Sequence, residues 1–357
     1  MFLQPRKLIN IMRLSFIKNN IRIILICFYL LLVLFLFQTG LIDINIILEY
    51  LSNPFLLFFS VLCGFLLIIT TVFRWQIICS KHHVQTKFLN LLEIVCISNI
   101  LGQVLPGGQI SGDFVRGALV GVSAKQHTNV LISAIYIDRY YTVVTLFWLA
   151  TVLSFFFFSK IWISPLMSIM LQTIYSVTLI LTMSFIFFQF RYRLPKRMIA
   201  NIPWQNLKKI LTIKFGKYIR PSIYIAINNS KFYFRSTISD NYSNFYLILL
   251  SIFGFIISSF ILIILLSPRE INIQIIMEVL FSAMTTWSVY LFSLTPGGIA
   301  VGELTFEHIY IGLDPLIKAG PIAANIWFVH RIIILLSNVI LLLVARLPHI
   351  SAAKTQL

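Results

Sequence analysis

The chain has 357 residues, of which 59% are hydrophobic and only 11% are charged, and its mean hydropathy is +0.93. Soluble domains are about 25% charged, so this composition excludes a soluble globular protein and indicates an integral membrane protein. The 28 Lys and Arg residues greatly outnumber the 11 Asp and Glu residues. Basic cytoplasmic loops explain such an excess in a membrane protein. Because the chain has no basic soluble domain, we exclude nucleic acid as a partner.

Apolar stretches long enough to cross a bilayer, which takes about 20 residues, occur at 21–38, 54–73, 130–158, 166–190, 245–267 and 323–345. The first stretch follows a basic start and lacks a small-residue cleavage pattern, so we expect an uncleaved span and not a signal peptide. The four cysteines form no close pair and no ligand spacing. We therefore expect no disulfide, no bound metal and no cofactor.

Two further segments, 89–122 and 276–313, are apolar but interrupted. Their first legs are helical in length and carry polar residues that lipid-facing spans avoid, namely Glu93, Asn99, Gln103 and Glu278. Their second legs are too short and too charged to cross alone. We therefore predict two re-entrant helical hairpins, which a bilayer tolerates only where protein buries them or where they line a cavity.

The basic residues support this topology. With a cytoplasmic N-terminus and two re-entrant hairpins, most Lys and Arg residues fall on the cytoplasmic side, including those of the basic linker 191–244. If the first hairpin crossed the membrane fully, that linker would move outside, against the positive-inside rule. We predict a multi-pass protein of the cell (inner or plasma) membrane with both termini cytoplasmic. The linker is either a plain topology signal or an interfacial helix on the inner leaflet.

Both hairpins contain the phrase P-G-G-x-x-x-G-[DE]. It comprises Pro106, Gly107, Gly108, Gly112 and Asp113 in the first hairpin, and Pro296, Gly297, Gly298, Gly302 and Glu303 in the second. An arginine follows each phrase early in the next span, in the pairs Asp138-Arg139 and His330-Arg331. Three crossings separate the hairpins, so we predict that they open to opposite sides as an inverted-topology repeat. The chain is then one all-α membrane domain over 1–357, with repeats at 89–190 and 245–345.

Each residue type in the phrase has a physical reason. Proline ends the first leg, and glycines permit the tight reversal. The spacing of small residues lets the return helix pack closely. Because that helix begins inside the protein, its free N–H groups and dipole favour an anion such as a lipid phosphate. The turns could also be purely architectural, and the two acids could serve only to complement the helix dipole.

Arg139 and Arg331 need partners, since a charged residue deep in a span costs about 2.5–3.5 kcal/mol. Asp138 is a poor partner for Arg139, because adjacent helical residues point in different directions. Each arginine forms either a structural ion pair with Asp113 or Glu303 or a bidentate clamp on a phosphate. His330 is either a polar interior residue or part of a proton relay.

The stretches "SNILGQVLPGGQISGDFVRGALV", "IYIDR" and "LTPGGIAVGEL" resemble the lysylphosphatidylglycerol synthase transmembrane region, also called the flippase-like domain family. The family's characteristic residues are matched by Asn99, Pro106, Gly107, Gly112, Asp113, Arg116, Asp138, Arg139 and Glu303. The resemblance implies the lipid-handling membrane half. We expect the soluble aminoacyl-transferase domain of the bifunctional synthases to be absent.

We predict a lipid- or anion-binding site formed by Asn99, Arg116, Asp138, Arg139, Glu307, His330, Arg331 and the residues of the two phrases. The favoured function is a flippase-like transporter of a phospholipid or a lipid-linked sugar. The alternatives are a non-catalytic membrane partner of a lipid- or glycan-modifying enzyme, and a membrane-embedded headgroup transferase. No nucleotide-binding loop or catalytic constellation is recognisable, so we name no catalytic residue.

Overall fold

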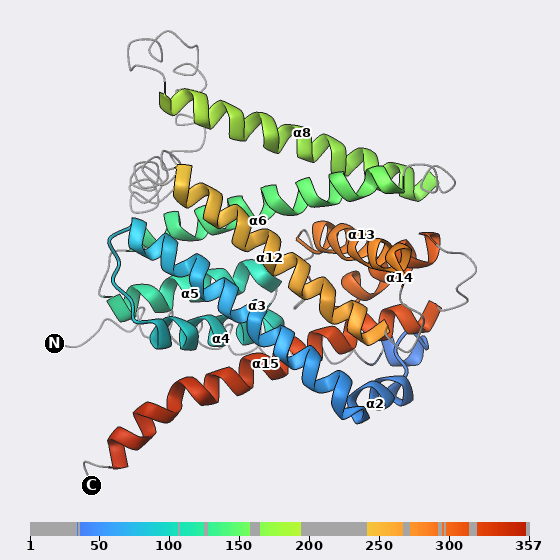
Figure 1. Cartoon of the computed structure of the whole chain (residues 1–357), viewed down its shortest axis with the longest axis horizontal. Coiled ribbons are helices and arrows are strands. Elements are labelled where there is room, and N and C mark those ends of the chain that lie inside the picture. Colours follow the sequence, from blue (N-terminus) through green and yellow to red (C-terminus); the bar gives the residue numbers. More distant parts are fainter. Residues whose placement is uncertain are drawn as a thin grey trace, which may run out of the picture.

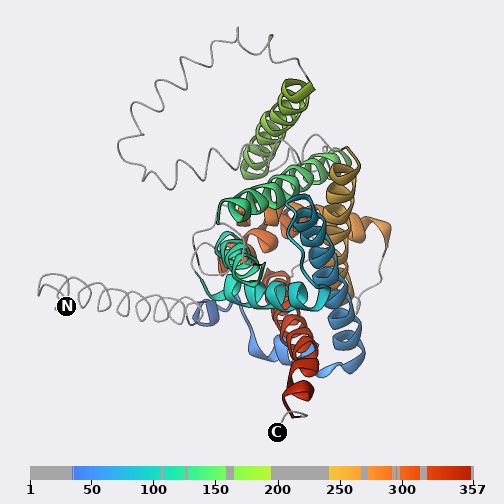
Figure 2. The ribbon, with the colours of Figure 1, turned by 90° about the vertical axis from the view of Figure 1, so that its left-hand side faces the viewer.

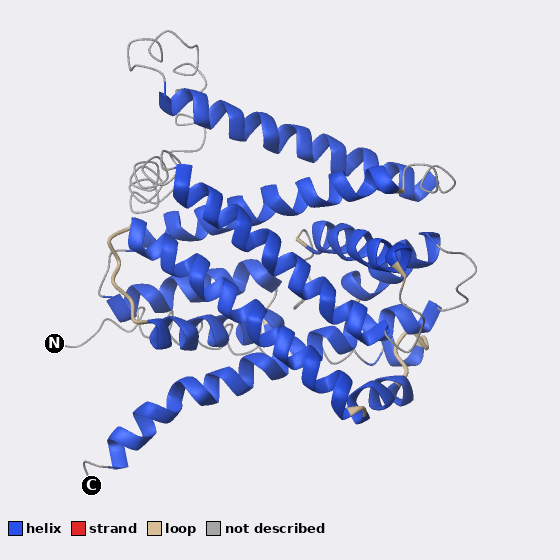
Figure 3. Ribbon diagram, viewed as in Figure 1, coloured by secondary structure: helices blue, strands red, loops and turns tan. Residues whose placement is uncertain are grey.

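A computed structural model describes residues 34, 36–105, 108–124, 128–157, 165–193, 241–266, 272–291, 295, 298–313 and 320–354. Every regular element within these ranges is a helix (Figure 3). The all-α architecture that the sequence predicts is therefore confirmed. Most of the basic linker and of the first predicted span lies outside the described residues.

The long helices of the bundle are α3 (Pro54–Lys81), α6 (Thr128–Phe156), α8 (Pro165–Arg193), α12 (Asn241–Leu266) and α15 (Gly320–Lys354). They fall on five of the six predicted spans. Among the described residues, five helices are long and apolar enough to cross a membrane. These are α3, α6, α12, α15 and also α13 (Ile273–Tyr290), which the sequence analysis placed in a hairpin. The apolar part of α8 is shorter, at Leu171–Ser184.

Helix α3 begins at a capping residue and is longer than the predicted span. Asn53 caps the helix by accepting hydrogen bonds from the backbone N–H groups of Phe55 and Leu56, and Pro54 follows at the first helical position. The prediction that this span ends at residue 73 is wrong, because the helix continues to Lys81 and so includes Arg74. Arg74 is an interior residue and not a loop cation.

Each repeated phrase joins two helices that pack on each other. In the first half, α4 (Phe88–Val104) precedes α5 (Gly108–Ala124), and in the second half α13 precedes α14 (Val301–Leu313). The bounds agree with the predicted hairpin legs. In Figure 1 the α4–α5 pair lies toward the left of the bundle and the α13–α14 pair toward the right, while α6 and α12 extend past both.

The remaining contacts set the shape of the bundle. Helix α12 packs on α3 and α6, and α15 packs on α3, α4 and α14. A short helix, α2 (Ile44–Ser52), contacts α3 and α15. Helix α8 lies at the outer edge against α6 (Figures 1 and 2). One apolar cluster joins α12 to α15 and contains Phe306 and Trp327, and a second joins α3, α4 and α6 and contains Val72 and Leu91.

The two turns are not identical. Helix α5 begins directly at Gly108, whereas α14 begins only at Val301, after Gly298 and Ala300 have both adopted φ of +67°. Gly298 thus adopts a positive φ, which glycine permits at a tight reversal. A Cβ there would come within 1.9 Å of the Tyr290 ring, so the absence of a side chain lets this tyrosine lie against the turn.

We predict that Gly298→Ala destabilises the protein by about 1–3 kcal/mol, because it adds a strained φ to a steric clash. Thermal unfolding in detergent measures the change. The matched control is Gly254→Ala in α12, where a Cβ would lie 3.6 Å from its nearest neighbour in ordinary van der Waals contact. Equal unfolding temperatures for the two variants would contradict the prediction.

Candidate functional site

A cavity of about 210 Å³ lies where the two halves of the bundle meet. Residues of α3, α4, α5, α6, α12, α13 and α15 line it. Its wall includes six charged residues: Arg74, Asp113, Arg116, Asp138, Arg139 and Arg331. We call this space the polar cavity.

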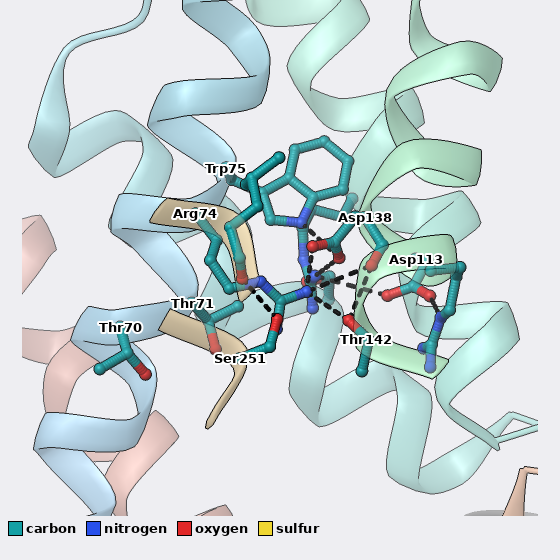
Figure 4. Close-up of polar contacts among 12 residues, drawn as sticks. Thr70, Thr71, Arg74, Trp75, Asp113, Asp138, Thr142 and Ser251 are labelled. Atoms are coloured by element: carbon teal, nitrogen blue, oxygen red, sulfur yellow. Dashed lines mark hydrogen bonds and ion pairs between the residues drawn. The ribbon is translucent and has the colours of Figure 1, made fainter. Parts of the chain in front are cut away.

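Asp138 of α6 joins α3 to α6 through its carboxylate (Figure 4). Arg74 forms an ion pair with one carboxylate oxygen and also donates a hydrogen bond of 2.6 Å to Thr142. The indole Nε1 of Trp75 donates to the other oxygen at 3.0 Å. Asp138 is only 4% exposed, so these contacts replace the water that an ionised carboxylate needs.

Arg116 of α5 is held by the first leg of its own hairpin. Its Nε donates to Ser98 Oγ at 2.9 Å, and its Nη2 donates to Asn99 Oδ1 at 2.7 Å. Its Nη1 lies 3.4 Å from Asp113 and 3.7 Å from Asp138. The guanidinium also sits 5.3 Å from the centre of the Trp75 ring, a favourable cation–π distance.

The same type of ion pair occurs once in each half. Arg139 pairs with Asp113 of the first hairpin, and Arg331 Nη1 lies 2.8 Å from Glu303 Oε1 of the second. Arg331 Nη2 also donates to Gln103 at 3.2 Å, which links α15 to the first hairpin. The structural ion pairs, one of the two alternatives that the sequence left open, are therefore present.

The position of Glu303 in its helix fits a role that depends on the helix dipole, whereas the position of Asp113 does not. Asp113 lies more than one turn after the start of α5 at Gly108, where the helix dipole has little effect. Glu303 does lie in the first turn of α14. It nevertheless uses its Oε1 on Arg331, so pairing across helices is what the two acids share.

The structure also places the other predicted site residues. Asn99 links Arg116 to Asn338 of α15, which accepts from Asn99 Nδ2 at 3.0 Å. His330 lines the polar cavity, and its Nε2 lies 2.9 Å from Ser258 Oγ. Glu307 is partly buried on α14 and is not part of the cavity wall.

The phrase glycines that can be described mark close helix contacts. At Gly112 a Cβ would lie 2.8 Å from the carbonyl oxygen of Ser98, which shows how tightly α5 packs on α4. At Gly302 a Cβ would lie 2.4 Å from Trp327 Nε1 of α15. The four remaining predicted turn residues lie outside the described residues: Pro106, Gly107, Pro296 and Gly297.

Sequence reasoning missed several residues of the cavity wall, namely Arg74, Ser98, Thr142, Ser258, Trp287, Tyr290 and Trp327. A signal for Arg74 was available. The apolar run "WQIICS" follows it directly, which indicates that the helix continues past the arginine. The aromatic residues gave no signal, since the sequence alone does not distinguish a tryptophan or tyrosine in a cavity wall from one at the membrane interface, where both are enriched.

The polar cavity has an uneven charge balance. Among the described residues, four arginines surround it, and three carboxylates (Asp113, Asp138 and Glu303) pair with them. With each group in its usual charge state, these seven described residues together carry one positive charge. The arginine side chains are at most 19% exposed, so this excess is largely shielded from solvent.

Apolar helices that surround buried arginines and acids define a multi-pass membrane protein with an ionised interior site. The chain belongs to the lysylphosphatidylglycerol synthase TM region family, whose model matches residues 20–341. The matched range contains every residue of the polar cavity, and it corresponds to the membrane part of those synthases. Neither a curated protein nor a solved structure gives a match to the chain.

We predict that Asp138→Asn destabilises the protein by about 3 kcal/mol, because it leaves Arg74 and Arg116 facing an uncharged amide inside the bundle. Denaturant or thermal unfolding in detergent measures the loss. The control is Glu93→Gln, which removes the partner of Arg346 from a pair whose side chains are 51% and 26% exposed. Such a pair contributes about 0–1 kcal/mol. The prediction is wrong if the two variants are equally stable.

Proposed function

We propose that this protein is a flippase-like transporter whose polar cavity binds one anionic lipid headgroup and passes it between the two leaflets. The observation that carries the proposal is that four buried arginines from different helices line one cavity, where the described residues pair them with three carboxylates. A phosphate offers such arginines a further anionic partner, because hydrogen bonds from guanidinium groups to phosphate oxygens are charge-assisted and strong.

The chemistry of the wall fits a phosphate. Arginine presents a planar set of N–H donors that matches phosphate oxygens, often in a bidentate way. The four guanidinium groups come from α3, α5, α6 and α15, so they approach the cavity from several directions. Asp113 and Glu303 then take the place of the phosphate, because they pair with Arg139 and Arg331 when no phosphate is bound.

The placement of the two helical hairpins supports alternating access. The α4–α5 and α13–α14 pairs lie toward opposite ends of the bundle (Figure 1), and each supplies the acid of an equivalent ion pair. We propose that they are re-entrant hairpins of an inverted repeat. The protein would lie in the cell (inner or plasma) membrane with both termini in the cytoplasm, and it would open to one leaflet at a time.

Retention of lipid by the purified protein tests the binding step. Wild type is expected to retain an anionic phospholipid in native mass spectrometry, and Arg139→Gln/Arg331→Gln is expected to lose at least about tenfold of it, since charge-assisted hydrogen bonds are removed. Arg346→Gln is the control, because that arginine lies on the surface. Equal lipid retention by all three proteins would sink the proposed binding site.

Transport is tested separately in proteoliposomes with fluorescent phosphatidylglycerol and a membrane-impermeant quencher. Wild type and Arg346→Gln are expected to move the lipid faster than protein-free liposomes do, and the double variant is expected to match the protein-free rate. Transport by the double variant at the wild-type rate would contradict the proposal. Binding without transport in wild type would also contradict it, and would favour the non-catalytic partner of a lipid-modifying enzyme.

A further inference from the structure

Arg331 of α15 bonds to both helical hairpins. Its Nη1 lies 2.8 Å from Glu303 Oε1 of α14, in the second hairpin, and its Nη2 donates a hydrogen bond of 3.2 Å to Gln103 Oε1 of α4, in the first. Gln103 and Arg331 are 228 residues apart in the chain, and both line the polar cavity. One guanidinium group therefore joins the two hairpins through two different nitrogen atoms.

Helix α15 is placed to carry this link. It packs on α4 and on α14, while the two hairpins lie toward opposite ends of the bundle (Figure 1). A second bond joins α15 to the first hairpin, since Asn99 Nδ2 donates to Asn338 Oδ1 at 3.0 Å, about two turns after Arg331. Both bonds hold α4 against α15, but the bond of Gln103 uses the arginine that also holds the second hairpin.

The second hairpin interacts with arginines of both halves as well. Tyr290, at the end of α13, lines the polar cavity and interacts electrostatically with Arg331 and with Arg139 of α6. Arg139 itself pairs with Asp113 of the first hairpin. Each arginine that follows a repeated phrase thus pairs with an acid of the preceding hairpin and also interacts with a residue of the other hairpin.

Sharing one arginine makes the displacement of one hairpin depend on the other. The pair with Glu303 is the stronger of the two contacts of Arg331, because both of its groups are charged. When α14 is displaced with this pair intact, the Arg331 side chain has to leave Gln103. Displacement of the second hairpin therefore costs the free energy of a bond that the first hairpin makes, and such a coupling acts equally in both directions.

We propose that Gln103 is a positioning residue that couples the two hairpins through Arg331, so that α14 is not displaced without loss of a contact to the first hairpin. An amide suits this role, because it accepts a hydrogen bond without adding a charge that would hold the arginine as tightly as Glu303 does. In the transport cycle, a role that rests on the proposed function, the coupling makes the two hairpins move together, as alternating access requires.

Hydrogen–deuterium exchange of the purified full chain tests the coupling without added lipid, because amide exchange reports the local opening of a helix. Gln103→Leu keeps a side chain of similar size in α4 and removes the acceptor. Exchange of the α14 amides, at Val301–Leu313, is expected to become about tenfold faster, since a hydrogen bond from a charged donor changes an opening equilibrium by about that factor. Gln103→Glu keeps an acceptor of the same reach, so its α14 is expected to exchange no faster than in wild type.

Two controls identify Arg331 as the link. Asn338→Leu removes the bond to Asn99, which joins the same helices α4 and α15 at a different residue of α15, so its α14 exchange is expected to match wild type. Arg331→Gln breaks both contacts of the arginine. It is expected to speed α14 exchange by itself and to abolish any further effect of Gln103→Leu.

Unchanged α14 exchange in Gln103→Leu overturns the coupling. An equal increase in Asn338→Leu also overturns it, because α4 and α15 would then simply have loosened. Either result leaves the proposed phosphate site standing. The tests of lipid retention and transport fail or succeed separately, because the exchange measurement depends on neither of them.

Discussion

The cost of placing charged side chains among membrane-spanning helices determines the interior of this protein. Each arginine in such a position costs about 2.5–3.5 kcal/mol unless it finds a partner, and four of them line one cavity. Asp138, Asp113 and Glu303 offset most of that cost through pairs that connect different helices. The ion pairs therefore hold the bundle together across its centre, and they gather four guanidinium groups around one cavity.

The two halves of the cavity use the same plan with different surroundings. In the first half Asp113, Asp138, Arg116 and their neighbours form a dense charged network. In the second half the Glu303–Arg331 pair joins α15 to α14, which packs on Trp327. A repeated hairpin followed by an arginine thus provides the common frame, while the side chains around it differ between the two halves.

Much of this arrangement follows from the sequence, and the rest depends on contacts between distant segments. Hydropathy predicts the long helices, and the repeated phrase predicts both helix pairs and names Asp113 and Glu303 as one of two possible kinds of partner for Arg139 and Arg331. The predicted span ended at residue 73 because a basic residue after an apolar run resembles the end of a span, whereas the helix continues to Lys81 and includes Arg74. The pairing of Asp138 with Arg74, 64 residues away, and the approach of Trp327 to Gly302 are set by packing, which a local pattern does not encode.

The central proposal is that the buried arginines of the polar cavity bind the phosphate of a lipid. The most direct measurement is an experimental structure of the full chain in nanodiscs that contain phosphatidylglycerol. The account predicts density for one headgroup, with its phosphate within hydrogen-bond distance of at least two of Arg74, Arg116, Arg139 and Arg331. A cavity that contains only water, with all four arginines in the same ion pairs and with lipid only on the outer surface of the bundle, would contradict it.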